Sequence, residues 1–189
     1  MAIGIDPLND YAFQILFGHA DHKMLTISLI NTLLDGEPPV TDVAFPITIH
    51  NKLSADGKLV MLDVLAEDGL GRKLNIKVQI GLSAGALIEQ PAQLHRDFRF
   101  REKSLPLTLT DQLQIHVLQL NHLQVTADTL CTASPVERWC WFLRHAQELT
   151  TEQLTLLLPE KEFTEAAKVL DRIAQTPEQL QEYNARLKA

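Results

Sequence analysis

Three polar residues stand at a spacing that could bring them into one small site: the acid Asp63, the lysine Lys77 and the amide Gln79. Each lies in an apolar run whose alternation is typical of a β-strand with one buried face. If the two runs pair as a hairpin, Asp63 falls opposite Lys77, at a Cβ separation of roughly 4.5–5.5 Å, and one diagonal step from Gln79. On this pattern alone, a cross-strand ion pair on a solvated face is the favoured interpretation, because such pairs are common and stabilise little.

The hairpin is predicted from the residues between the two runs. Asp68-Gly69-Leu70-Gly71 carries an aspartate and two glycines, which we expect to supply the positive φ angles of a tight reversal. If a three-residue loop pairs Asp68 with Arg72, this register places Asp63 opposite Lys77. The side chains expected to face the core are Val60, Leu62, Val64 and Ala66 in the first arm, and Leu74, Ile76, Val78 and Ile80 in the second.

A second candidate is a basic cluster interleaved with Phe98 and Phe100. It is the best candidate in the sequence for contacts to nucleic acid, and a solvated strand edge explains it equally well. The cluster consists of Arg96, Arg99, Arg101 and Lys103.

Histidine and cysteine chemistry is weakly indicated. His19 and His22 could share a metal on a helix, but Gly18 places them in a loop and no set of cysteines or carboxylates completes a site. Cys131 and Cys140 lack zinc-type spacing, and we expect them to be small hydrophobic residues in a reducing cytoplasm.

The elements around the hairpin follow from caps and periodicity. Asn9 or Asp10 is expected to cap a first helix that ends at Gly18, and residues 21–34 are expected to form a second helix. Further along, the patterns predict a strand over 40–49 broken at Pro46, a polar loop over 51–57, a strand over 112–120, helices from about 135, and a last helix capped by Thr176 with Pro177 at its first position.

The hairpin and the N-terminal helices resemble the PD-(D/E)XK nuclease superfamily, specifically its Rpn-like recombination-promoting nucleases, or PD-(D/E)XK family transposases. Members carry L-D-V, D-x-x-G and N-I-E-[VMI]-Q phrases, preceded by D-x-x-F-K-x-[IL]-F-G and L-N-x-L-L. The matching residues here are Leu62-Asp63-Val64, Asp68 with Gly71, Asn75-Ile76-Lys77-Val78-Gln79, Asp10, Phe13, Leu16-Phe17-Gly18 and Leu29-Ile30-Asn31-Thr32-Leu33-Leu34.

The resemblance implies an endonuclease that uses Mg²⁺ to hydrolyse DNA. In relatives the first aspartate, here Asp63, and the glutamate of N-I-E bind the metal, and Gln79 stands where other members carry the catalytic lysine. This chain departs from the pattern, because Lys77 occupies the glutamate position and Gln14 replaces the lysine of the first phrase. The departure at Lys77 predicts weak or absent activity.

The chain also departs from the family after Gln79. Members continue with an arginine-bearing helix, a G-x-x-Y phrase and a further strand, before a segment of the type H-x-x-F…L-T-D-x-L-x-I-H-x-L-E-L. Here that later segment begins at His95, and Gly81, Gly85 and Pro91 make the intervening residues a poor helix. We infer an internal deletion, with a diverged arginine helix over 95–101 as the alternative.

Composition sets the remaining expectations. The 189 residues fit one domain, or one domain with a helical appendage. A hydrophobic content of 46% and a charged content of 22% are ordinary for a globular protein. No apolar run approaches the roughly 20 residues of a membrane span, and the N-terminus shows no secretion signal. A net charge of −7 argues weakly against indiscriminate binding of nucleic acid, but a basic cleft would suffice for a nuclease.

The sequence therefore predicts an α+β chain with an internally truncated, restriction-endonuclease-like core over 1–125 and a helical region over 133–189. Two functions follow: a remnant DNA nuclease of a mobile-element family, or a non-catalytic module that binds DNA or protein through the same fold. A shortened sheet should leave one edge uncovered, and this predicts self-association.

Overall fold

The computed structural model describes residues 1–34, 36–45, 57–83 and 92–187. The chain divides into two compact units, of which the first joins Met1–Leu29 to Leu123–Ala189 and the second spans Ile30–His122. The expected division into 1–125 and 133–189 stays a prediction. Within the described residues, no helix is long and apolar enough to cross a membrane.

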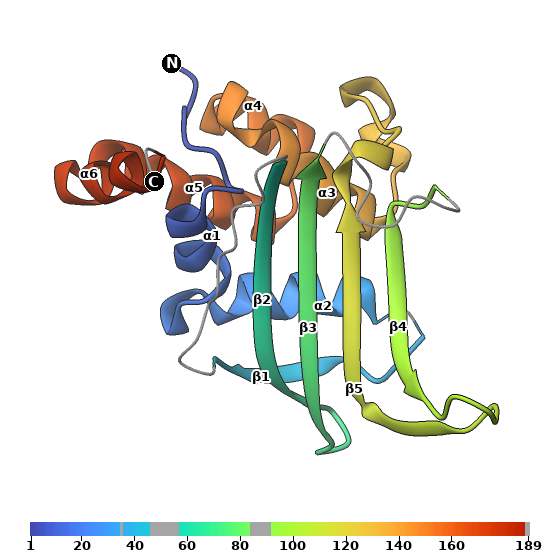
Figure 1. Ribbon diagram of the computed structural model, residues 1–189. Coiled ribbons are helices and arrows are strands. Elements are labelled where there is room, and N and C mark those ends of the chain that lie inside the picture. Colours follow the sequence, from blue (N-terminus) through green and yellow to red (C-terminus); the bar gives the residue numbers. More distant parts are fainter. Residues whose placement is uncertain (35, 46–56, 84–91, 188–189) are drawn as a thin grey trace. The chain divides into compact units, whose positions relative to one another are not determined.

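The first unit is helical (Figure 1). Its first helix begins where predicted: the side chain of Asn9 accepts hydrogen bonds from the backbone N–H groups of Tyr11 and Ala12, and Gly18 ends the helix. The α-helices are α1 (Asp10–Phe17), α2 (Lys23–Leu33, which runs into the second unit), α3 (Pro135–His145), α4 (Thr151–Leu157), α5 (Lys161–Gln175) and α6 (Pro177–Arg186).

The expected helix over 21–34 is divided in two. A 3-10 turn, η1 (Ala20–His22), precedes α2, and the Nδ1 atom of His19 accepts a hydrogen bond from the N–H of Asp21. This side-chain cap starts a separate turn, which the apolar periodicity of the segment did not reveal.

Aromatic side chains form the core of the first unit. Trp139 lies 4.6 Å from Phe163, 5.5 Å from Phe17 and 5.8 Å from Phe142, measured between ring centroids. All four rings are buried. These aromatic side chains therefore pack in a core and do not offer a stacking surface for bases.

The second unit is a five-stranded mixed sheet in the order β1-β2-β3-β5-β4 (Figure 1). Only β3 and β5 pair in parallel; the other neighbours are antiparallel. The strands are β1 (Val40–Ala44), β2 (Gly57–Asp68), β3 (Lys73–Ser83), β4 (His95–Arg101) and β5 (Thr108–Gln119), and the 3-10 turn η2 (Leu120–His122) follows β5.

The connection from β3 to β5 includes β4, which lies at the edge of the sheet. Parallel neighbours need a long crossover, which is usually a helix. Between β3 and β5 the described residues contain no helix, and β4 instead lies on the outer side of β5. The alternative of a diverged helix over 95–101 is wrong, because the segment forms strand β4 and pairs along β5. The internal deletion stays a prediction, and residues 84–91 lie outside the described residues.

The core-facing side chains of the hairpin are as predicted. All eight predicted core residues of β2 and β3 are buried. The strand expected over 40–49 is β1, which ends at Ala44; residues 46–49 lie outside the described part of the chain. Gly57, expected at the end of a polar loop, already belongs to β2, and residues 51–56 are also outside the described part.

Candidate functional site

The hairpin register is the predicted one. The backbone N–H of Asp68 donates to the carbonyl of Arg72 at 3.1 Å, so three residues form the loop. Along the ladder, Asp63 is opposite Lys77, and Met61 is opposite Gln79. Because side chains alternate along a strand, Asp63, Lys77 and Gln79 share the face opposite the buried one.

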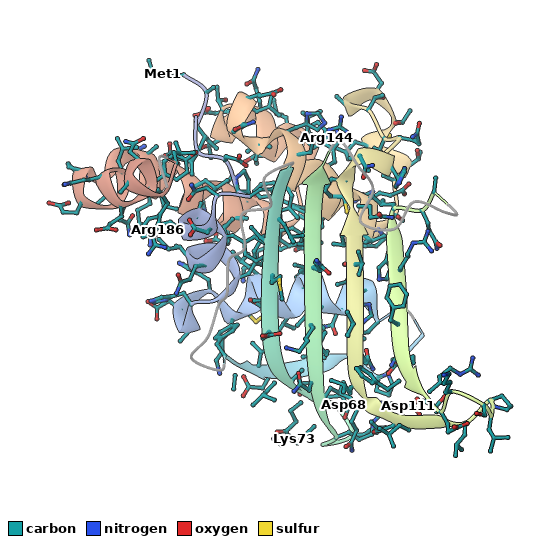
Figure 2. The ribbon with its side chains drawn as sticks, viewed as in Figure 1. Met1, Asp68, Lys73, Asp111, Arg144 and Arg186 are labelled. Carbon is teal, nitrogen blue, oxygen red and sulfur yellow. The ribbon has the colours of Figure 1, made fainter. Side chains whose placement is uncertain are left out.

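Asp68 stabilises the turn of the hairpin by accepting hydrogen bonds within it. Its Oδ1 accepts hydrogen bonds from the N–H groups of Leu70 and Arg72, both at 2.9 Å, and its Oδ2 accepts from Arg72 Nε at 2.6 Å. Burial acts to raise the pKa of Asp68, but these hydrogen bonds and the guanidinium charge hold it below its usual value. Figure 2 shows Asp68 near Lys73 at the end of the hairpin.

The glycines of the loop differ from the expectation in one respect. Gly71 has a φ of +76°, in the region that favours glycine, but Gly69 does not have a positive φ. The D-x-x-G phrase is therefore explained by a single left-handed residue and a capping aspartate.

Asp63 and Lys77 form a direct ion pair. The Nζ atom of Lys77 lies 2.7 Å from Asp63 Oδ1. The Asp63 side chain is 24% exposed and that of Lys77 is 42% exposed, so water screens the pair in part. Pairs of this kind contribute up to about 1 kcal/mol to stability.

The side chains around Asp63 do not fit a divalent metal. Mg²⁺ prefers oxygen ligands and is usually held by one or two carboxylates. Here one carboxylate faces an ammonium group, with the amide of Gln79 on the same face. Within the described part of the chain, no group of three or more histidine, cysteine, aspartate or glutamate side chains could hold a metal ion.

Two rows of residues extend from this face across the sheet. One row runs Asp63, Lys77, Ile115 and Phe98 through β2, β3, β5 and β4. The neighbouring row runs Met61, Gln79, Val117 and Arg96. Arg96 therefore lies on the same face as Asp63 and Gln79, two strands away from Gln79.

The other members of the basic cluster are elsewhere. Arg99 belongs to the opposite face, where its guanidinium contacts Asp97 at 2.6 Å and Glu37 at 2.8 Å. These carboxylates raise the pKa of Arg99 against the effect of burial. Arg101 and Lys103 are exposed, beyond an irregularity in the pairing of β4 with β5. The sheet thus divides the cluster that the sequence presents as one run.

A buried polar chain was not expected from the sequence. His95 Nε2 lies 3.0 Å from His116 Nδ1, and His116 Nε2 lies 3.2 Å from Gln114 Oε1. Gln114 Nε2 in turn lies 3.5 Å from a carboxylate oxygen of Glu37. His116 and Gln114 are fully buried. Apolar alternation along β5 would place these polar side chains in solvent, so the pattern carried no signal for their burial.

The surroundings of these hydrogen-bonded side chains favour the neutral form of His95 and His116. Burial lowers the pKa of His116 to about 4; Asp97 opposes this shift, and His95 and Arg99 add to it. Burial also lowers the pKa of His95, and Asp97 again opposes the shift. The bond from Gln114 Nε2 to Glu37 leaves Gln114 Oε1 to accept from His116, and this fixes His95 as the donor between the two rings.

The remaining candidates do not converge on a site. The rings of His19 and His22 are 6.0 Å apart between centroids, and His19 Nδ1 lies 3.5 Å from Asp21 Oδ2. Burial lowers the pKa of His22, and His19 and Arg172 add to this shift. Cys140 is buried, which raises the pKa of its thiol, whereas Cys131 is exposed.

Comparison with known proteins places the chain in a family. The family model described as PD-(D/E)XK nuclease family transposase matches residues 7–84 and 80–189. Searches of curated proteins and of solved structures gave no match. The family match covers nearly the whole chain, including the hairpin with Asp63 and Gln79. The chain therefore belongs to the PD-(D/E)XK nuclease family transposases.

Proposed function

We propose that this chain is a degenerate nuclease of its family, with weak or no cleavage of DNA. The observation that carries the proposal is the Asp63–Lys77 ion pair of 2.7 Å. In the family pattern a glutamate stands at the position of Lys77, and two carboxylates would hold Mg²⁺ there. An ammonium group at that position repels the cation and occupies the one carboxylate that is left.

The ancestral reaction is hydrolysis of a phosphodiester bond in DNA, linked to recombination or mobile elements. When bound, Mg²⁺ polarises the phosphate and activates water. Of the residues that would support this chemistry, Asp63 and Gln79 keep their positions on one face, and Lys77 offers a positive charge in place of the second acid. Arg96, on the same face, is the residue of the basic cluster best placed to contact a phosphate.

The second candidate is a non-catalytic module that binds DNA or a protein through the retained fold. Its support is the exposed part of the basic cluster, Arg101 and Lys103, beside the exposed rings of Phe98 and Phe100. The cytoplasm is the compartment we propose for either function.

A nicking assay on supercoiled plasmid tests the first candidate. The unmodified protein, the Asp63→Ala variant and a reaction with EDTA are compared in Mg²⁺ and in Mn²⁺. We expect equal, background levels of nicking in all three. Strong metal-dependent nicking that Asp63→Ala abolishes would overturn the proposal, and would mean that another carboxylate has taken the ligand role. DNA binding without cleavage, measured by fluorescence anisotropy, would favour the second candidate.

A further inference from the structure

The outer side of β4 is one edge of the sheet. β4 is the last strand of the sheet, and among the described residues no strand pairs with its outer side. The N–H of Gln119 donates to the carbonyl of Leu94 at 2.8 Å, and His95 is opposite Leu118 in the same ladder. Bonded and non-bonded pairs alternate between antiparallel strands, so Arg96 and Phe98 bond toward β5. His95, Asp97 and Arg99 therefore direct their backbone N–H and C=O groups to the open edge.

This alternation limits how the edge can pair with a second copy of itself. In an antiparallel pair, the residues that direct their backbone outward must bond with one another. A pair centred on Asp97 places that acid opposite the partner's Asp97, and a pair centred on Arg99 places two arginines opposite each other. A pair centred on Phe98 instead places Asp97 opposite the partner's Arg99, twice by symmetry. Opposite charges across strands are favourable and like charges are unfavourable.

The same register joins two exposed aromatic rings on the other face. Phe98 is 40% exposed, although it is a large apolar side chain. In the Phe98-centred pair it lies opposite the partner's Phe98 in a non-bonded position, where Cα atoms approach to about 4.5 Å. Contact between the rings would remove apolar surface from water. Charge, backbone geometry and apolar surface thus select one register.

We propose that two copies of this chain associate by antiparallel pairing of β4 with β4, centred on Phe98. The two sheets then form one continuous sheet across a two-fold axis. The edge suits a second copy better than a phosphate backbone, because Asp97 and Glu37 neutralise Arg99. The inference rests on the geometry of β4 and is independent of nuclease activity.

A pair of charge variants tests the central contact. Light scattering coupled to size-exclusion chromatography should show a dimer for the unmodified protein and monomers for Phe98→Glu and for Phe98→Lys, because each variant opposes two like charges across the axis. An equimolar mixture of the two variants should recover the dimer. Leu109→Glu is the matched control: Leu109 is 77% exposed but lies outside β4, and its variant should stay dimeric. A monomeric unmodified protein, or a mixture that stays monomeric, would overturn the proposal.

A cross-linking experiment tests the same register without charge. In a Cys131→Ser background, Phe98→Cys should form an intersubunit disulfide under mild oxidation, because a non-bonded antiparallel pair brings the two Cα atoms within disulfide range. Phe100→Cys, at a position of equal exposure, should cross-link much less, because its symmetry mate lies four residues away along the partner strand. Equal cross-linking at both positions, with circular dichroism showing that both variants fold, would contradict the proposed register.

Discussion

Replacing Lys77 by glutamate should strengthen metal binding on the hairpin face. The change converts a positive charge, 2.7 Å from Asp63 Oδ1, into a second carboxylate at the position where the family carries one. Two unit charges about 6 Å apart in water interact by about 0.7 kcal/mol. The Lys77→Glu substitution changes the side-chain charge by two units, and Mg²⁺ carries two charges. The binding free energy of Mg²⁺ therefore improves by about 3 kcal/mol, which is about 100-fold in affinity.

Screening lowers this figure, because the Lys77 side chain is 42% exposed. With a Debye length of about 10 Å at 0.1 M salt, roughly half of the energy is left, and the gain becomes about tenfold. Isothermal titration calorimetry with Mg²⁺ and with Mn²⁺ measures it directly. Lys103→Glu makes the same change of charge at an exposed position and serves as the control. Equal metal binding by the two variants, or binding by Lys77→Glu no tighter than that of the unmodified protein, would refute the role of the Lys77 charge.

Three further predictions concern stability. Folding lowers the pKa of His116 from 6.5 to about 4, so the unfolded chain binds a proton at a higher pH than the folded protein does. The free energy of unfolding should therefore fall by up to about 3 kcal/mol as the pH drops through that range. Urea titrations at each pH test this, and His116→Gln should make the free energy of unfolding depend less on pH. Gly71→Ala should lower the free energy of unfolding by about 1–2 kcal/mol, because alanine disfavours the positive φ of this position. Gly69→Ala lacks that strain and should lower the free energy of unfolding less, and thermal melts of both variants test this. Asp68→Ala should cost about 1–3 kcal/mol in the same melts, because it leaves the N–H groups of Leu70 and Arg72 without their acceptor; an unchanged melting temperature would contradict the capping role.

The hairpin could be predicted in detail because its information is local. The alternation in each arm assigns the faces, and the three-residue loop between Asp68 and Arg72 sets the register. Together they place Asp63 opposite Lys77. The first helix is similar, since the side chain of Asn9 caps its start by short-range hydrogen bonds and Gly18 follows its last residue.

The arrangement of the other strands could not be predicted, because it depends on contacts between distant segments. Nothing local shows that β3 pairs in parallel with β5, or that β4 takes the edge. Arg96 and Arg99, which the sequence presents as one basic cluster, lie on opposite faces because side chains alternate along β4.

The burial of His116 and Gln114 could not be predicted either, because it also depends on contacts with distant segments. The alternation along β5 indicates which side chains share a face but not which face is covered. The polar side is the buried one here, and the hydrogen bonds that compensate for it come from Glu37 and His95, both far away in the sequence.

The most direct test of the central claim is whether a metal ion approaches Asp63 at all. Paramagnetic Mn²⁺, added to the unmodified protein at millimolar concentration, broadens the NMR signals of residues close to a bound ion. If Lys77 takes the place of the metal, the backbone amides of Asp63 and Gln79 should broaden no more than that of the exposed Glu102. Selective broadening at Asp63 and Gln79 would show that this face still binds a divalent cation, and would contradict a degenerate centre.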